Sequence, residues 1–137
     1  RNVIPGRGTL RVDLRAASDD VLSSMDAALH TACRELQAGD ALAVDIEQVV
    51  YFPPQPFHQE QIQAVRNAAD QLGFTHTDIV SGAGHDAVYL ARVAPTAMIF
   101  IPCRNGVSHR PDEYAAPADI ALGTSVLAAA LAKLASE

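Results

Sequence analysis

The segment that most restricts how this 137-residue chain can fold is the proline-rich stretch FPPQPF, residues 52–57. Proline has no backbone N–H and a nearly fixed φ angle, so this stretch fits neither a central strand nor the interior of a helix. It also stiffens the backbone. We therefore interpret residues 52–57 as a hinge between one unit at 1–51 and another at 58–137.

The sequence before the hinge predicts a strand-helix-strand unit. Apolar residues alternate with charged residues over 8–15, which is the period of a strand with one wet face. Ser18 can cap a helix that begins with two acids, carries an apolar stripe and ends at Gly39. Residues 41–51 then read as a second strand. Such a unit is about half of a ferredoxin-like domain.

The sequence after the hinge alternates between helical and extended patterns. The predicted elements, in order, are a helix with apolar residues at Ile62, Val65, Ala69 and Leu72 and a stop at Gly73, a strand at 77–80, a short helix, a buried strand at 96–101 and an alanine-rich helix at about 119–134. A continuous apolar strand between helices is typical of a parallel or mixed sheet that is covered on both faces. The predicted fold class is therefore α/β.

Composition restricts the class of protein and its partners. The chain is 49% hydrophobic, and its net charge of -6 includes no cluster of Lys or Arg, so nucleic acid is not an expected partner. No apolar run approaches the length of about 20 residues that a membrane-spanning helix needs. With no signal peptide at its start, a cytoplasmic setting is expected. Cys33 and Cys103 lack a CxxC spacing, so we expect two reduced thiols rather than a disulfide or a zinc ribbon. Because the chain opens without Met, it is either a processed product or a piece of something longer.

Two loops follow predicted strands, at the position where open α/β sheets bind ligands. The glycine loop, residues 81–86 (SGAGHD), fits the dinucleotide pattern G-x-G-x-x-A through Gly82, Gly84 and the following Ala87, but no acid follows the next strand as that fold requires. Its glycines would still let backbone N–H groups approach a carboxylate or phosphate closely. Asp86 would cap or charge the start of the next helix while His85 packs or bonds locally, and direct catalysis by this pair is the alternative.

The histidine loop, residues 102–114, places His109 four residues before Glu113, and Pro111 between them disfavours a continuous helix. A neutral imidazole at a strand end can be a metal ligand or a general base, and a nearby carboxylate often orients it. A solvated surface histidine is the alternative, because one His alone defines no metal site. The remaining histidines, His30, His58 and His76, are expected at the surface.

Four separated pieces of the sequence carry a resemblance when they are taken together. They are NVIPG at 2–6, VDLR at 12–15, SGAGHDA at 81–87 and AMIFIPCRNGVSHRPDEY at 97–114. They resemble the hydantoinase/carbamoylase-type amidases, a group that includes N-carbamoyl-L-amino acid and allantoate amidohydrolases and belongs with the aminoacylase- and carboxypeptidase-like dinuclear metallohydrolases. The resemblance spans essentially the whole chain. PCRNG stands where the family more often has PSRDG, which affects the expected substrate more than the reaction class.

The resemblance implies a subunit with an α/β catalytic domain and a ferredoxin-like lid domain that forms a homodimer. Residues 1–51 would be the second half of the lid, and residues 58–137 the C-terminal half of the catalytic domain. The implied site residues are His109 as the last metal ligand, Glu113 and His85 as candidates to orient it, Asn2 and Arg15 for the substrate's carboxylate or carbonyl end, and the backbone of Gly82, Ala83 and Gly84 for the carboxylate. Arg15 suits this role because a guanidinium can pair bidentately with a carboxylate.

The implied activity is metal-dependent cleavage of the C–N bond in N-carbamoyl (ureido) amino acids or related linear amides. The implied cofactors are two divalent ions per subunit, zinc or alternatively manganese, cobalt or nickel. The chain has no His-x-Asp or Glu-Glu pair of the family kind and no general-base glutamate, so we expect it to be inactive alone. Two alternatives stay open, a non-catalytic dimerisation or binding module and a nucleotide-binding α/β domain.

Overall fold

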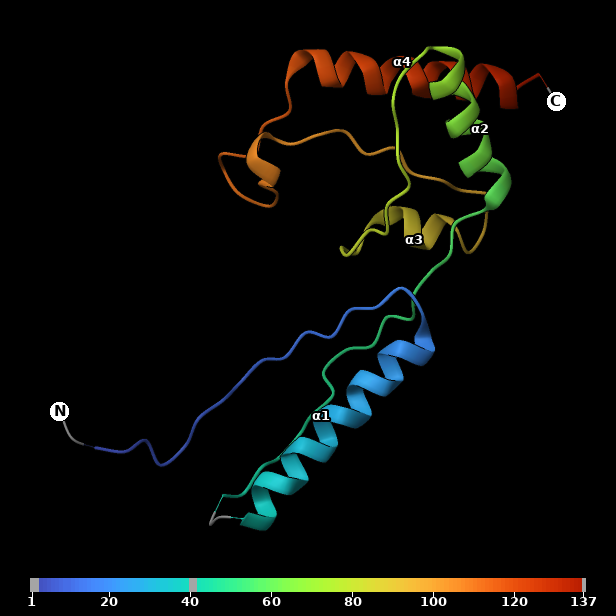
Figure 1. Ribbon diagram of the computed structural model, residues 1–137. Helices are drawn as coiled ribbons and strands as arrows, with labels where there is room; N and C mark the ends of the chain where they lie inside the picture. Colours follow the sequence, from blue (N-terminus) through green and yellow to red (C-terminus); the bar gives the residue numbers. More distant parts are fainter. Residues whose placement is uncertain (1–2, 40–41, 137) are drawn as a thin grey trace. The chain divides into compact units, whose positions relative to one another are not determined.

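The computed structural model describes residues 3–39 and 42–136. Within these ranges the elements are α1 (Asp19–Gly39), α2 (Gln59–Gln71), α3 (Asp86–Leu90), a short 3-10 turn (Arg104–Gly106) and α4 (Pro117–Leu134) (Figure 1). The chain divides into two compact units, Arg1–Pro54 and Gln55–Glu137. The division between them lies inside the proline-rich segment.

The first unit contains the helix that the sequence predicts. The Ser18 carbonyl accepts the N–H of Leu22 at 3.1 Å, and two aspartates occupy the first turn, where the positive end of the helix dipole stabilises them. Two side chains tie the segment 42–51 to this helix, because Tyr51 donates its hydroxyl hydrogen to Asp19 and Gln37 donates to the Val44 carbonyl at 3.0 Å. The segment therefore runs back along α1 (Figure 1).

The predicted strands of the first unit are extended but unpaired. In the described residues, 8–15 and 42–51 form no strand ladder, and the predicted residue 41 lies outside the described residues. Leu10 is 91% exposed and Val12 is 57% exposed, although the alternation had assigned both to a covered face. A strand buries its apolar face and satisfies its N–H and C=O groups only against a partner. The predicted sheet is not confirmed.

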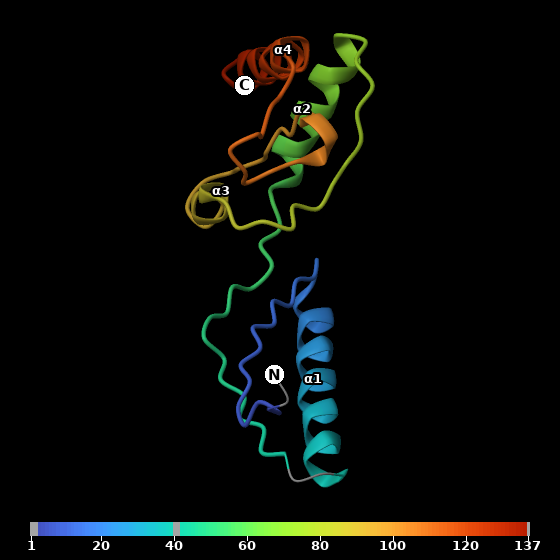
Figure 2. The same ribbon diagram turned by 90° about the vertical axis from the view of Figure 1, so that its left-hand side faces the viewer.

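The second unit is built on the contact between α2 and α4, which lie side by side (Figure 2). Its core residues are small, and the set is Ala68, Ala69, Val126 and Ala130, with Val65, Phe74, Ile99 and Ala129 packed against it. The predicted α2 stripe is partly wrong, because Leu72 is 40% exposed and Ala64 and Ala68 are buried in its place. Small side chains leave room for two helices to approach closely. The predicted stop at Gly73 is confirmed, with φ at +73°.

The segment 96–101 runs through the second unit in an extended conformation. It is half-buried rather than buried, and Phe100 is 48% exposed. It approaches α4 closely, because a Cβ built on Gly123 would lie 2.5 Å from Cγ2 of Ile101. At its start, the Thr96 N–H donates to His58 Nδ1 and the Thr96 carbonyl accepts the His58 N–H, both at 3.1 Å. His58, expected at the surface, is half-buried and anchors this segment.

Helix α4 is the most apolar of the described helices of ten or more residues. It begins at Pro117, and by length and composition alone it could cross a membrane, although no apolar run of that kind was expected. Val126 and Ala130 are buried in the contact with α2, so packing in the second unit explains part of its apolar composition without a bilayer. A core helix of a water-exposed protein passes the same length test.

Candidate functional site

The histidine loop is closed at its base by one pair of residues. The Arg104 N–H donates to the Tyr114 carbonyl at 2.8 Å, and the Arg104 guanidinium lies over the Tyr114 ring at 3.9 Å from its centroid. The chain reverses in the short turn between these contacts, where Asn105 and Gly106 have φ of +57° and +66°. Positive φ values allow a tight reversal that is costly for most residues other than glycine and asparagine.

His109 lies near the far end of this loop. Its φ is +58°, its side chain is exposed, and its backbone N–H donates to Glu113 Oε2 at 2.8 Å. The expected partnership with Glu113 is therefore present, but the carboxylate holds the backbone amide of His109 rather than the imidazole. Arg110 and Asp112 form a neighbouring ion pair at 3.0 Å. These contacts shape the loop, while the exposed side chain of His109 makes no hydrogen bond or ion pair with the described residues.

The glycine loop begins a helix of five residues, α3. Its N-cap is His85, whose Nδ1 accepts the Ala87 N–H at 3.1 Å, so His85 rather than Asp86 makes the cap bond. The Ser81 hydroxyl accepts the Ala83 N–H at 3.3 Å, and a Cβ at Gly82 or Gly84 would meet nothing within 4 Å. The described fold therefore does not itself require glycine at 82 and 84. A five-residue helix also gives little support to the nucleotide-binding alternative.

Arg15 belongs to the first unit and Asn2 lies outside the described residues. The Arg15 guanidinium is exposed and bonds the Asp13 carboxylate through Nε at 3.0 Å and through its terminal nitrogen at 2.5 Å. This hydrogen bonding lowers the pKa of Asp13 and raises the pKa of Arg15. Both bonds end on a single oxygen, Oδ2 of Asp13, so this contact is not the two-oxygen bidentate pairing that the sequence suggested for a substrate carboxylate.

The candidate residues do not form a metal centre by themselves. Among the described residues, no three side chains of His, Cys, Asp or Glu gather closely enough to hold an ion. A structural or catalytic zinc site needs at least three protein ligands. The described part of the chain therefore fits one ligand position, through the exposed imidazole of His109, and does not fit a complete two-metal site. Both cysteines are free and half-buried.

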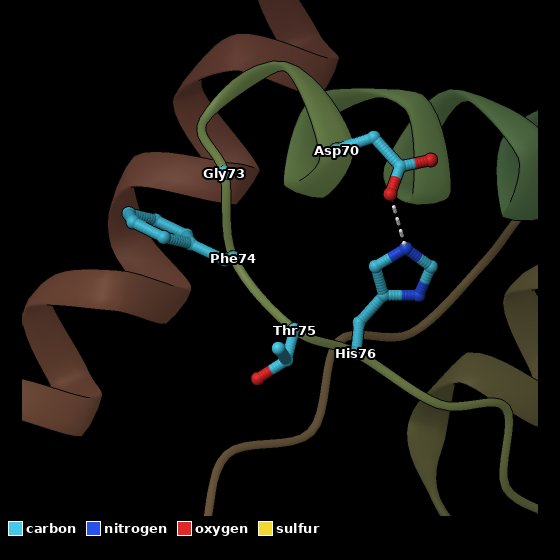
Figure 3. Close-up of a pocket in the computed structure, with 5 residues that line it drawn as sticks. All are labelled: Asp70, Gly73, Phe74, Thr75 and His76. Carbon is cyan, nitrogen blue, oxygen red and sulfur yellow. Dashed lines mark hydrogen bonds and ion pairs between the residues drawn. The ribbon is translucent and has the colours of Figure 1, made fainter.

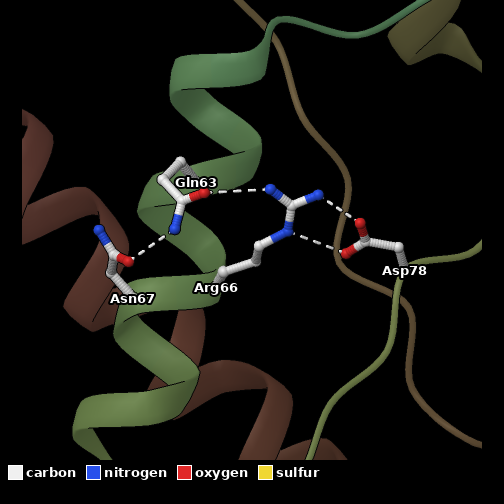
Figure 4. A network of polar contacts seen from close by, with 4 residues as sticks. All are labelled: Gln63, Arg66, Asn67 and Asp78. Atoms are coloured by element: carbon white, nitrogen blue, oxygen red, sulfur yellow. Dashed lines mark hydrogen bonds and ion pairs between the residues drawn. The ribbon is translucent and has the colours of Figure 1, made fainter.

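A His-x-Asp spacing does occur at His76 to Asp78, and the sequence reasoning overlooked it. In the structure the two side chains have different ion-pair partners. His76 pairs with Asp70 at 3.0 Å beside a shallow hollow next to Phe74 (Figure 3), whereas Asp78 receives a bidentate ion pair from Arg66 (Figure 4). Both contacts tie the segment after α2 back to that helix, so this spacing serves the fold rather than a metal.

The Arg104–Tyr114 contact was also missed. Arg104 and Tyr114 are ten positions apart, near the two ends of the histidine loop. The sequence signal that could have predicted their contact was an Arg and an aromatic residue flanking the same loop. The expected surface position of His76 agrees with its exposure, and His30 is half-buried with Nε2 at 3.8 Å from Asp26.

Comparison with known proteins identifies the class. The family model of peptidase family M20/M25/M40 matches residues 4–133, and the chain belongs to this family. The resemblance to hydantoinase/carbamoylase-type amidases is confirmed. A crystal structure of an amidase of the hydantoinase/carbamoylase family from Burkholderia vietnamiensis is 49% identical, with a TM-score of 0.71 over 83% of this chain and 28% of that chain. A second family member, from Burkholderia ambifaria, is 41% identical with a TM-score of 0.76, covering 85% of this chain and 27% of its own.

The chain is also similar to curated amidohydrolases. The N-carbamoyl-L-amino-acid amidohydrolase of Rhizobium meliloti is 39% identical over 127 residues, which cover 93% of this chain and 30% of that enzyme. The allantoate amidohydrolase of Bacillus subtilis strain 168 is 36% identical over 138 residues, covering 98% of this chain and 32% of that enzyme. The chain therefore spans about three tenths of the length of the relatives it matches.

Proposed function

We propose that this chain forms part of a metal-dependent amidohydrolase that cleaves the C–N bond of an N-carbamoyl amino acid or a related linear amide such as allantoate. The observation that carries the proposal is the 39% identity to an N-carbamoyl-L-amino-acid amidohydrolase across 93% of the chain. The exposed imidazole of His109, at the end of a closed loop, supports it, because such a group is free to take a ligand.

In this proposal each candidate residue has one role. His109 donates one ligand to a pair of divalent ions, of which zinc, manganese, cobalt and nickel all accept imidazole. Arg15 and Asn2 bind the carboxylate or carbonyl end of the substrate, and a substrate carboxylate would have to compete with Asp13 for the exposed Arg15 guanidinium. The backbone of Gly82, Ala83 and Gly84 approaches the substrate carboxylate. The general base and the remaining metal ligands belong to parts of the enzyme outside this chain.

The same proposal gives each of the two units a place in the domains of the enzyme. Residues 1–51 are half of a lid domain that forms a homodimer, residues 52–57 are the hinge, and residues 58–137 are half of an α/β catalytic domain. The extended segments would then pair with strands that this chain does not contain. Their exposed apolar side chains support this, since Leu10 at 91% and Val12 at 57% exposure would otherwise stay in water.

The experiment uses the intact enzyme that contains this chain. We expect His109→Ala to lower kcat/KM for N-carbamoyl amino acids or allantoate by at least about a hundredfold and to reduce the metal content after dialysis. His76→Ala is the matched control, because His76 is an exposed histidine of the same unit that pairs with Asp70. The 137-residue chain alone should show no turnover. Full activity of His109→Ala, or turnover by the isolated chain, would contradict the proposal.

The dimerisation or binding module is the second candidate. The observation that favours it is the exposure of apolar side chains on the extended segments of the first unit. A pure pairing module has no reason to hold two metal ions per subunit. Elemental analysis of the intact protein therefore separates this candidate from the enzyme, while saturable binding of NAD(H) in a titration would favour the nucleotide-binding alternative.

A further inference from the structure

The histidine loop is exposed, and contacts between its own residues hold its two ends together. Its two ends are joined twice through one residue pair, by the hydrogen bond from the Arg104 N–H to the Tyr114 carbonyl and by the stacking of the guanidinium on the ring. A stacked Arg–aromatic contact at 3.9 Å is close for a cation–π pair, which extends to about 6 Å. The ends of the loop are thereby fixed relative to each other.

The tip of the loop is held by a separate contact. His109 has a left-handed backbone conformation, which is unfavourable for a residue that carries a Cβ. The Glu113 carboxylate accepts the His109 N–H at 2.8 Å, and a charged acceptor makes this a strong hydrogen bond. Strained backbone of this kind persists where the surrounding contacts determine it, and it is frequent at functional sites. These backbone contacts leave the side chain of His109 exposed.

We propose that Arg104, Glu113 and Tyr114 are positioning residues for His109. Tyr114 and Arg104 clamp the base of the loop, and Glu113 fixes the backbone of His109, so that the imidazole projects in one direction before any ligand arrives. Without the clamp, the loop would have to become ordered when the ligand of His109 binds. The free-energy cost of that ordering would then weaken the binding of the ligand. This inference rests on the proposed function for the role of His109, but the clamp itself is a property of the loop.

Conservative and disruptive substitutions separate positioning from simple stability. Tyr114→Phe keeps the ring, and Arg104→Lys keeps a cation without the planar stacking surface. Tyr114→Ala and Arg104→Ala remove the stacked contact while leaving the backbone hydrogen bond in place. Glu113→Gln keeps a neutral acceptor for the His109 N–H, and Glu113→Ala removes it. Arg92→Ala is the matched control, because Arg92 lies over Tyr89 at 5.5 Å in the same unit, outside the histidine loop.

Two measurements on the intact enzyme test the inference. Hydrogen exchange followed by mass spectrometry should show faster exchange in peptides covering 103–114 for Tyr114→Ala and Glu113→Ala, by about fivefold or more, with other peptides unchanged. Steady-state kinetics should show kcat lowered about tenfold for Tyr114→Ala with KM within about twofold. Tyr114→Phe should retain both properties of the parent, and Glu113→Gln should recover most of them. Arg104→Lys should fall between Arg104→Ala and the parent.

The outcomes distinguish the clamp from the proposed function. Unchanged exchange in 103–114 for both alanine variants would overturn the clamp, as would an equal loss of kcat in Arg92→Ala. A loss in Tyr114→Phe as large as in Tyr114→Ala would also count against it, because the ring would then not be the cause. If His109→Ala keeps full activity, the proposed role of His109 fails, whereas the exchange data still decide whether the three residues hold the loop.

Discussion

The two units of this chain differ in how they are held together. All the buried residues among the described residues lie in the second unit, mainly where α2 meets α4, whereas α1 of the first unit buries none. The first unit is held by exposed polar ties, such as Tyr51 to Asp19 and Gln37 to Val44. Apolar burial is the main source of stability in a domain and exposed polar contacts add little. The second unit should therefore carry most of the stability of the chain.

The largest expected effect comes from placing a charge in the core of the second unit. Ala130 is 3% exposed, and Ala130→Asp would bury a carboxylate without a partner. The free energy of unfolding should fall by about 3 kcal/mol or more, as measured by urea denaturation followed by circular dichroism. Ala28→Asp on α1 is the matched substitution in the first unit, where the side chain is exposed, and it should change stability by less than about 1 kcal/mol. Equal losses of unfolding free energy in the two variants would contradict the conclusion that the second unit carries most of the stability.

A smaller effect is expected from the ion pairs that each unit contains. The pKa of Asp78 is lowered from 3.8, mainly by its hydrogen bonds from Arg66, with the charges of Arg66 and His76 adding to the effect. Because the folded pKa is the lower one, the pair stabilises the fold above pH 3.8, and this contribution is lost as the pH falls through the folded pKa. Asp78→Asn should lower the unfolding temperature near neutral pH, and the difference from the parent should shrink in acid.

The matched ion pair in the first unit is the one between Asp13 and Arg15. The pKa of Asp13 is also lowered, by Arg15, but Arg15 is only two residues away, whereas Arg66 and Asp78 are twelve residues apart. A pair so close in sequence can also form in the unfolded chain, so it contributes less to the difference between the two states. Asp13→Asn should therefore change the unfolding temperature less than Asp78→Asn at neutral pH. A larger change would contradict the assignment of stability to the second unit.

The smallest expected effect concerns the hydrogen bond from the Tyr51 hydroxyl to Asp19 at the start of α1. The pKa of Tyr51 is raised above 10.0, mainly by the hydrogen bond to Asp19, since ionising the phenol would break that bond. Absorbance titration should show Tyr51 ionising late in the parent, and Asp19→Ala, which removes the acceptor, should lower the pKa of Tyr51 again. Tyr51→Phe should leave the unfolding of the second unit unchanged. An ordinary titration of Tyr51 in the parent would show that this tie does not form.

The sequence predicted the features that depend on neighbouring residues. Three helices, the Gly73 stop and the short helix after the glycine loop follow from periodicity and capping, which act over one or two turns. The boundary at the proline-rich segment follows from the chemistry of proline itself. The proximity of His109 and Glu113 was also predictable, because Pro111 keeps the three residues between them in a loop.

Other features depended on partners far away in the sequence. Strand pairing is one, since an alternating segment such as 8–15 has no means of its own to satisfy its N–H and C=O groups. The anchoring of Thr96 by His58 is another, across 38 residues. The site shows the same division. Residue types and spacing in the sequence determined which side chains could act, whereas only the tertiary structure decided that Glu113 holds the backbone of His109 and that Tyr114 closes the loop on Arg104, because those contacts depend on atoms meeting in space.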